Sequence, residues 1–358
     1  MKQIKIGSKT IGDGYPTFVI AEMAWSHDGS LEKAKKIFKG AGDADADAIS
    51  VHITSLENYM VKDYGDTIKG PLSVGKDKGK ENIYNYLDRI NLKNSEWQEL
   101  FSYARELGLI ICAMPNDIQS IQLCEILNPD CYVIAAACFI EEQHVQEIAE
   151  QKKPVILRVG GATLGEIENT INALKGYDIE DILLLHGFQL YPTRMEDTNL
   201  RIIPSLKDIF GFPVGIAEHL AGDDSLAMVI PLVALACGAT TIEKHLTHDR
   251  ELKGEDYVSA LSPDKFKTFV GQVRDVEKSF GSPAIEPLTE AELRYRMVSR
   301  KRAITAKPLK KGTIINSTDI TYKRSDSGIY PDEVRSIIGK TTREDIDQDA
   351  AITWDKIL

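Results

Sequence analysis

The sequence lacks the features that would place the chain in a membrane or on a nucleic acid. Its first residues contain no apolar segment of the kind found in signal peptides. The longest nearly apolar run, residues 226–237, is too short to span a bilayer and contains Pro231. The net charge is −11, and acidic and basic residues are interspersed, so no surface for nucleic acid or anionic membrane is expected. We therefore expect a cytoplasmic protein that acts on small molecules.

Cysteine is scarce, and its pattern predicts neither a disulfide framework nor a redox motif. The number is odd and no Cys-x-x-Cys pair occurs. Most of the five lie in or beside apolar runs, which predicts buried free thiols in a reducing compartment. They are Cys112, Cys124, Cys131, Cys138 and Cys237.

The first 280 residues alternate short apolar runs with segments of helical period. The apolar runs are rich in Val, Ile, Leu and Ala without strict alternation, which is typical of strands buried on both faces of a parallel sheet. Eight such runs, each followed by a helix, predict a (β/α)8 TIM barrel. An open doubly wound sheet is the alternative, but no glycine-rich phosphate loop follows the first run. The expected strands are residues 17–22, 47–52, 109–113, 131–135, 154–158, 182–186, 213–217 and 240–244.

Local signals mark helices at residues 30–42, 94–107, 163–176 and 262–281. Thr163 and Glu166 form a capping-box pattern, and Ser262-Pro263 is a typical helix start. A long apolar helix is expected between the last two strands. The oversized connection at residues 54–91 contains Tyr59, Tyr64 and the basic residues 76–80, and we expect it to form a lid or a substrate wall.

The sequence changes character after Gly281. Prolines mark a linker at residues 282–300, which includes a charged helix at 289–300. Residues 301–358 then predict a small β-rich domain with short strands at 302–306, 310–313, 320–323 and 338–340. The expected organisation is a barrel at 1–281, the linker, and this second domain.

Histidines and acids gather where the predicted strands end. Catalytic groups in such barrels come from the carboxyl ends of several strands. Those ends carry Glu22, His52, His186, Glu218-His219 and His245. Any one of these histidines could be a structural residue bonded within a loop, but four on one rim favour a functional site.

The strongest candidate site is a metal held by His219 and His245, which follow the last two strands. Parallel strands joined by one helix end on the same side, so the two imidazoles could share one divalent cation. Mn²⁺ is the expected ion, with Mg²⁺ or Zn²⁺ as alternatives. Such an ion would polarise a carbonyl, with Glu22 as a further ligand or as general base.

Nearly the whole chain resembles the sialic acid synthase family, whose members condense phosphoenolpyruvate with an N-acetylhexosamine aldehyde to form nonulosonic acids. The resemblance rests on motifs that occur in the family's order. The last domain resembles the family's antifreeze-like (SAF) domain through residues 310–312, 323–324, 327–329 and 339–340. The barrel motifs are Ile20-Ala21-Glu22, Ser26-His27-Asp28-Gly29, Tyr191-Pro192-Thr193, Gly215-Ile216-Ala217-Glu218-His219, Ile242-Glu243-Lys244-His245 and Gly254-Glu255-Asp256.

The resemblance implies roles for individual residues. His219 and His245 match the metal-binding histidines, and Glu22, Tyr191 and Gln189 match positions around the reacting centre. Asp256 matches a sugar-contacting residue. Arg324 matches the arginine that the SAF domain inserts into the partner subunit's site, which implies a domain-swapped homodimer. Arg158, His52 and His186 are further candidates for substrate contacts.

Several departures concern the groups that hold phosphoenolpyruvate in the family. Lysines are replaced by Ser50 and Val133, and hydroxyl-bearing residues by Met114, Ala136, Ala217 and Arg158, while an acid is replaced by Cys138. Each charge-assisted hydrogen bond lost with a lysine is worth roughly 1.5–3 kcal/mol. Arg158 could restore one cation.

Three functions therefore remain open from the sequence. The first is a metal-dependent transferase of the sialic acid synthase type. The second keeps the barrel and the metal but acts as a lyase, aldolase or hydrolase on a ligand other than phosphoenolpyruvate. The third is a non-catalytic sugar-binding paralogue, which the retained histidines, Glu22 and Tyr191 disfavour.

Overall fold

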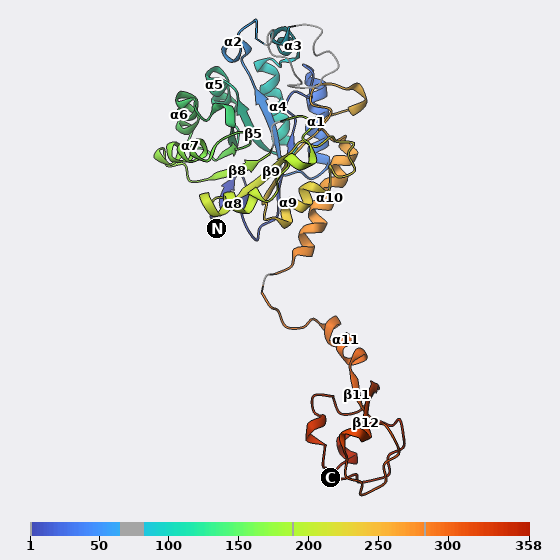
Figure 1. The fold of residues 1–358 in the computed structure, drawn as a ribbon. Coiled ribbons are helices and arrows are strands. Elements are labelled where there is room, and N and C mark those ends of the chain that lie inside the picture. The colour runs from blue at the N-terminus through green and yellow to red at the C-terminus, as the bar shows by residue number, and fades with distance from the viewer. Residues whose placement is uncertain (1, 65–81, 188–189, 283) are drawn as a thin grey trace. The chain divides into compact units, whose positions relative to one another are not determined.

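The computed structural model describes residues 2–64, 82–187, 190–282 and 284–358. Eight parallel strands close into a barrel surrounded by helices, which confirms the predicted TIM barrel over the open sheet (Figure 1). In order around the barrel they are β10 (Thr241–His245), β3 (Phe18–Glu22), β4 (Ala48–Ile53), β5 (Ile110–Pro115), β6 (Cys131–Ala135), β7 (Val155–Arg158), β8 (Ile182–His186) and β9 (Val214–Glu218).

The helices form an outer layer whose starts follow local capping rules. The Thr163 hydroxyl accepts a hydrogen bond from the Glu166 amide at 3.3 Å, and the Glu166 carboxylate accepts one from the Thr163 amide at 2.7 Å, so the predicted capping box is present. The barrel helices are α1 (Leu31–Asp43), α2 (Leu56–Tyr59), α3 (Ile83–Ile90), α4 (Asn94–Glu106), α5 (Ile118–Leu127), α6 (Glu142–Glu150), α7 (Leu164–Gly176), α8 (Ile202–Phe210), α9 (Ile230–Ala236) and α10 (Pro263–Phe280).

Strand side chains alternate between two cores. One lies between the strands and the helices, and the other fills the barrel interior. Ile20, Ile156 and Ala217 point into the interior core, so residues two positions further along their strands point inward as well. This alternation places Glu22, Arg158 and His219 on the inner side of the barrel mouth.

A hairpin that the sequence pattern did not predict closes the other end of the barrel. It consists of β1 (Ile4–Ile6) and β2 (Lys9–Ile11). Ile4, Ile6 and Ile11 are buried in the interior core. The Lys5 amide donates to the Asp181 carboxylate at 3.1 Å, just before β8 begins, so the hairpin lies at the amino ends of the strands.

The expected long apolar helix between β9 and β10 is shorter than predicted. Helix α9 has seven residues, and turns occupy the preceding residues 226–229. Pro231 lies in the first turn of α9, where its missing N–H costs no hydrogen bond, so the helix begins close to this residue.

Residues from Ser282 to Leu358 form a second compact unit. It contains α11 (Glu290–Ser299), β11 (Lys301–Thr305) and β12 (Ile320–Arg324), and the two strands pair antiparallel. Two of the expected strands, at 310–313 and 338–340, are wrong. Gly312 and Gly339 have φ of 82° and 83°, so the chain turns at both places.

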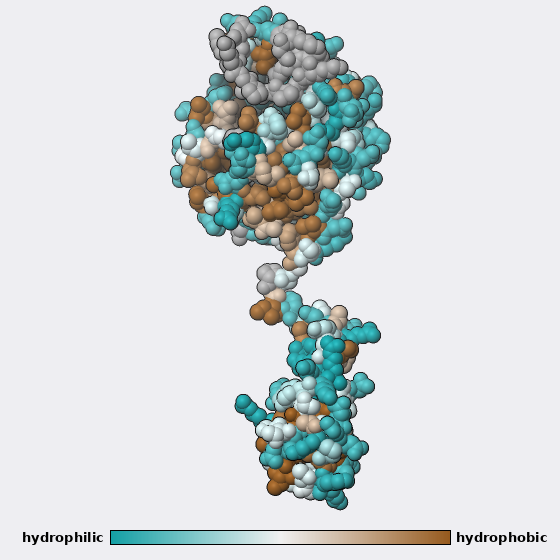
Figure 2. Space-filling view, turned by 45° about the vertical axis from the view of Figure 1, so that its right-hand side comes forward, coloured by the Kyte–Doolittle hydropathy of each residue, from teal (hydrophilic) through white to brown (hydrophobic). Residues whose placement is uncertain are grey.

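On the face shown in Figure 2, the barrel unit has hydrophilic residues toward its right-hand edge and an apolar area over its lower part. In the part of the chain that the structure describes, no helix is long and apolar enough to cross a membrane. The five cysteines are free, and four of them are buried as expected; Cys237 is partly exposed.

Candidate active site at the barrel mouth

The barrel mouth brings together His219, His245 and Tyr191. The two imidazole centroids are 5.2 Å apart. The Tyr191 ring lies 4.3 Å from His219 and 5.5 Å from His245, and its hydroxyl is 3.1 Å from Nε2 of His219. The two histidines at the ends of the last two barrel strands thus lie next to each other beside a phenol.

His245 has the properties of a metal ligand. It is 1 % exposed, and neither ring nitrogen has a hydrogen-bond partner among the described residues. Burial, and then the neighbouring His219, lower its pKa well below the usual value, so the ring is neutral and keeps a lone pair for a cation. The backbone carbonyl of His219 accepts hydrogen bonds from the Thr193 amide at 2.9 Å and the Ser259 hydroxyl at 2.8 Å, which orients the residue.

A buried guanidinium occupies the floor of the mouth. Arg158 forms ion pairs with Glu22 and with Glu243, the latter at 2.7 Å between Nη2 and Oε1. His52 lies beside this trio, with Nε2 3.6 Å from the Glu22 carboxylate and 3.5 Å from Nη1 of Arg158. The charge of Arg158 is therefore balanced by two carboxylates of the chain.

The two carboxylates differ in proton affinity. Burial opposes the charged form of Glu22, but Arg158, His52 and His245 outweigh it and lower its pKa to about 2. Burial raises the pKa of Glu243 to about 7, and repulsion by Glu22 adds to the effect while Arg158 opposes it. Glu22 is therefore the fixed anion, and Glu243 can exchange a proton near neutral pH.

Glu243 was not singled out from the sequence. It lies two residues before His245 on β10, so both side chains point to the interior. The spacing Glu243-x-His245 at a strand end was the signal that could have identified it. Its intervening neighbour, Lys244, points outward and forms a buried ion pair with Glu218.

The other predicted site residues occupy different surroundings. His186 follows the inward-facing Leu185 and therefore lies on the outer side of its strand. Its Nε2 is 3.0 Å from the Thr198 carbonyl. This geometry does not support a substrate contact. Asp256 accepts a hydrogen bond from the Trp25 amide at 3.1 Å and thereby links the loops after β10 and β3. Gln189 and residues 65–81 of the long loop lie outside the described residues. Arg324 is exposed at the end of β12 in the second unit.

Two family models together match most of the chain. The model of the NeuB family matches residues 37–284. The chain belongs to the NeuB family. The SAF domain model matches residues 301–358 and confirms the type of the second domain.

Several relatives of the chain are named as synthases of pseudaminic, legionaminic or neuraminic acids. It is 31% identical to the pseudaminic acid synthase of Campylobacter jejuni over 92% of this chain and 93% of the relative. It is 29% identical to the N,N'-diacetyllegionaminic acid synthase of the same species, covering 94% and 98% of the two chains. Among solved structures, an N-acetylneuraminic acid (sialic acid) synthetase from Leptospira borgpetersenii aligns with a TM-score of 0.71 and 28% identity, covering 82% of this chain and 96% of that one.

Proposed function

We propose that this protein is a transferase of carbohydrate biosynthesis that condenses phosphoenolpyruvate with an open-chain N-acetylhexosamine to form a nonulosonic acid. The observation that carries the proposal is the convergence of His219, His245 and Tyr191 at the mouth of the barrel, in a chain of which more than nine tenths aligns with synthases of such acids.

His219 and His245 would hold a divalent cation, for which Mn²⁺ is our first choice. The donor set supports this role, because His245 is buried, neutral and has two unpartnered ring nitrogens among the described residues. When bound, the cation would supply Lewis-acid polarisation of the sugar aldehyde. The hydroxyl of Tyr191 lies within reach of the same volume and would orient that aldehyde.

The chain's own groups would manage protons and charge. Glu22, held ionised by Arg158, would stabilise positive charge that develops at the enolpyruvyl carbon. Glu243, with a pKa raised to about 7 by burial, is suited to activate the water that adds to this carbon. His52 lies beside Glu22 and Arg158 and would complete the polar floor.

Substrate selection would come from the loops and from a second chain. Gln189 would line the donor side, and Asp256 would contact the sugar. Arg324, exposed on the SAF domain, would enter the site of a partner in a domain-swapped homodimer. Helix α11 supports such an assembly, since it contributes no buried side chain although it carries Leu293, Met297 and Val298.

A second candidate function follows from Arg158. Its two carboxylate partners leave the cation balanced rather than available for a phosphate. Ser50, Met114 and Ala217, which replace phosphate-binding types, are buried small or apolar residues. This favours, as the alternative, a lyase, aldolase or hydrolase that uses the same metal pair on a less anionic ligand. A non-catalytic sugar-binding protein is the third candidate.

One assay separates these functions. The full-length protein is incubated with Mn²⁺, phosphoenolpyruvate and a panel of N-acetylhexosamines, and phosphate release is measured. Release that requires both substrates and disappears in His219→Ala supports the synthase. The matched control is His186→Ala, a rim histidine outside the barrel interior, which should retain most of the activity.

Metal analysis decides the remaining cases. No phosphate release, combined with bound metal that is lost in His219→Ala and kept in His186→Ala, would reject the synthase and favour the second candidate. A protein that binds no divalent cation at the barrel mouth would contradict both enzymatic proposals.

A further inference from the structure

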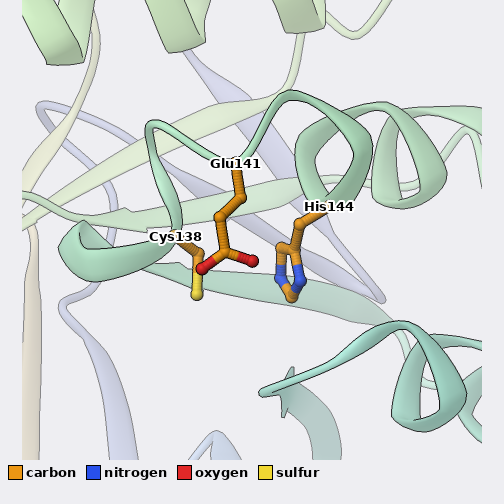
Figure 3. Close-up of side chains that lie close together, drawn as sticks. All are labelled: Cys138, Glu141 and His144. Atoms are coloured by element: carbon orange, nitrogen blue, oxygen red, sulfur yellow. The ribbon is translucent and has the colours of Figure 1, made fainter. Parts of the chain in front are cut away.

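A second cluster of metal-ligating side chains lies on the connection between β6 and α6 and does not include the histidine pair. It is formed by Cys138, Glu141 and His144, whose ligand atoms all lie within 4.8 Å of one another. Cys138 ends a 3₁₀ turn (Ala136–Cys138) directly after β6, Glu141 caps helix α6, and His144 lies in its first turn. Figure 3 shows the three side chains pointing to the same side of this connection.

The histidine of this cluster is buried without hydrogen bonds to its ring nitrogens from the described residues, which packing alone does not explain. His144 is 1 % exposed, and both ring nitrogens lack a hydrogen-bond partner among the described residues. Buried polar groups are nearly always bonded, so such a ring indicates a missing ligand. Burial lowers the pKa of His144 and keeps the ring neutral, as metal coordination requires.

The surrounding charges favour a cation. Burial, and then the nearby Glu141 carboxylate, raise the pKa of the Cys138 thiol to about 12, so the thiol is protonated when no cation is bound. Burial lowers the pKa of His144, and the nearby Asp117 carboxylate opposes this effect. Asp117 is itself fixed by hydrogen bonds from the Ser55 amide at 2.8 Å and the Ser120 amide at 2.9 Å. A positive ion placed between Cys138 and His144 would therefore lie near two negative groups.

We propose that Cys138, Glu141 and His144 bind a zinc ion. One sulfur, one imidazole nitrogen and one carboxylate oxygen match Zn²⁺, whereas Mg²⁺ and Ca²⁺ prefer oxygen ligands throughout. Tetrahedral coordination places ligand atoms roughly 3.3–3.8 Å apart, a spacing that these side chains reach with small rotations at most. Zinc forms a bond to the Cys138 sulfur, whose S–H bond breaks, and the proton leaves to solvent.

Three protein ligands leave a fourth position open, and the exposed Glu141 places that position toward solvent. The bound ion would join the end of β6 to the start of α6. It would thereby stiffen one wall of the barrel mouth. This site uses none of the residues assigned to the proposed reaction, so it stands or falls separately.

Cobalt substitution of the metal-stripped full-length protein tests the proposal. Co²⁺ bound to a thiolate produces a ligand-to-metal charge-transfer band that Co²⁺ bound to histidines alone does not. We expect the band in the wild type and in His219→Ala, and its loss in Cys138→Ser. Cys237→Ser is the control, since it removes a partly exposed thiol outside the cluster and should keep the band.

Glu141→Gln and His144→Gln keep the test valid if Cys138→Ser does not fold. Both should weaken zinc binding by more than the roughly 10–100-fold that follows loss of an outer-shell partner. Absence of the band in the wild type at saturating Co²⁺, or its persistence in Cys138→Ser, would overturn the proposal. Unchanged zinc affinity in Glu141→Gln and His144→Gln would do the same.

Discussion

Arg158 determines the electrostatics of the barrel mouth at the scale of single residues. It brings a cation into the barrel interior, where Glu22 and Glu243 form ion pairs with it. Two carboxylates around one guanidinium cannot both ionise easily in a buried site. Glu22 stays charged because its pKa is lowered, whereas the pKa of Glu243 is raised.

The raised pKa of Glu243 predicts a pH-dependent stability. Its pKa rises from 4.5 to about 7 on folding, so the folded protein binds more protons between these values. The free energy of unfolding should therefore fall as the pH rises from 5 to 7, by up to about 3 kcal/mol. Glu22, with a pKa lowered to about 2, loses its stabilising effect only at lower pH.

Glu243→Gln should remove most of this pH dependence. Urea unfolding of the variant and the wild type at intervals between pH 5 and 7.5 measures it. Glu168→Gln, which changes an exposed carboxylate on α7, serves as control and should reproduce the wild-type curve. A wild type whose stability rises across this range would contradict the assignment.

Among the secondary-structure elements, the repeating strand–helix units leave the amino end of the barrel interior uncovered. The β1–β2 hairpin covers it by placing Ile4, Ile6 and Ile11 in the interior core. Three-residue strands are too short to show a period, so the sequence pattern did not reveal the hairpin. All eight barrel strands, in contrast, were predicted to within two residues at each end. The helix before β10 was overestimated because composition alone does not locate a helix start.

Ile6→Ala should destabilise the protein by about 2–5 kcal/mol, because it removes buried methyl groups and leaves a cavity at the base of the barrel. Chemical denaturation of the full-length protein measures the loss. Ile126→Ala is the matched control, since Ile126 on α5 is 72% exposed and its truncation should change stability by less than about 0.5 kcal/mol. Equal effects of the two substitutions would refute the closing role of the hairpin.

At the scale of the whole molecule, the chain consists of two units with separate cores. The second core is formed by residues such as Ala303, Ile315 and Ile352. In the proposed homodimer, each active site combines the barrel of one chain with Arg324 of the other chain. A substitution in the barrel would therefore inactivate the site of its own chain, and a substitution of Arg324 would inactivate the site of the partner chain.

This arrangement predicts complementation between two inactive variants. His219→Ala should fail through its barrel, and Arg324→Ala through the site of its partner. In an equal mixture that has exchanged subunits, half of the dimers are mixed and each has one intact site, so about a quarter of wild-type activity should return. Phosphate release before and after exchange measures it. Recovery that does not depend on exchange, or no recovery despite verified mixed dimers, would contradict the domain-swapped arrangement.

The barrel, the type of the second domain and the positions of Glu22, His52, His219 and His245 at strand ends could be predicted from the sequence. This was possible because strand runs and the residues that follow them are local features. The raised pKa of Glu243, the ion pairs of Arg158 and the unpartnered ring nitrogens of His144 among the described residues became visible only in the folded chain. These properties depend on burial and on charges from distant strands and loops, and no local pattern records which side chains meet there.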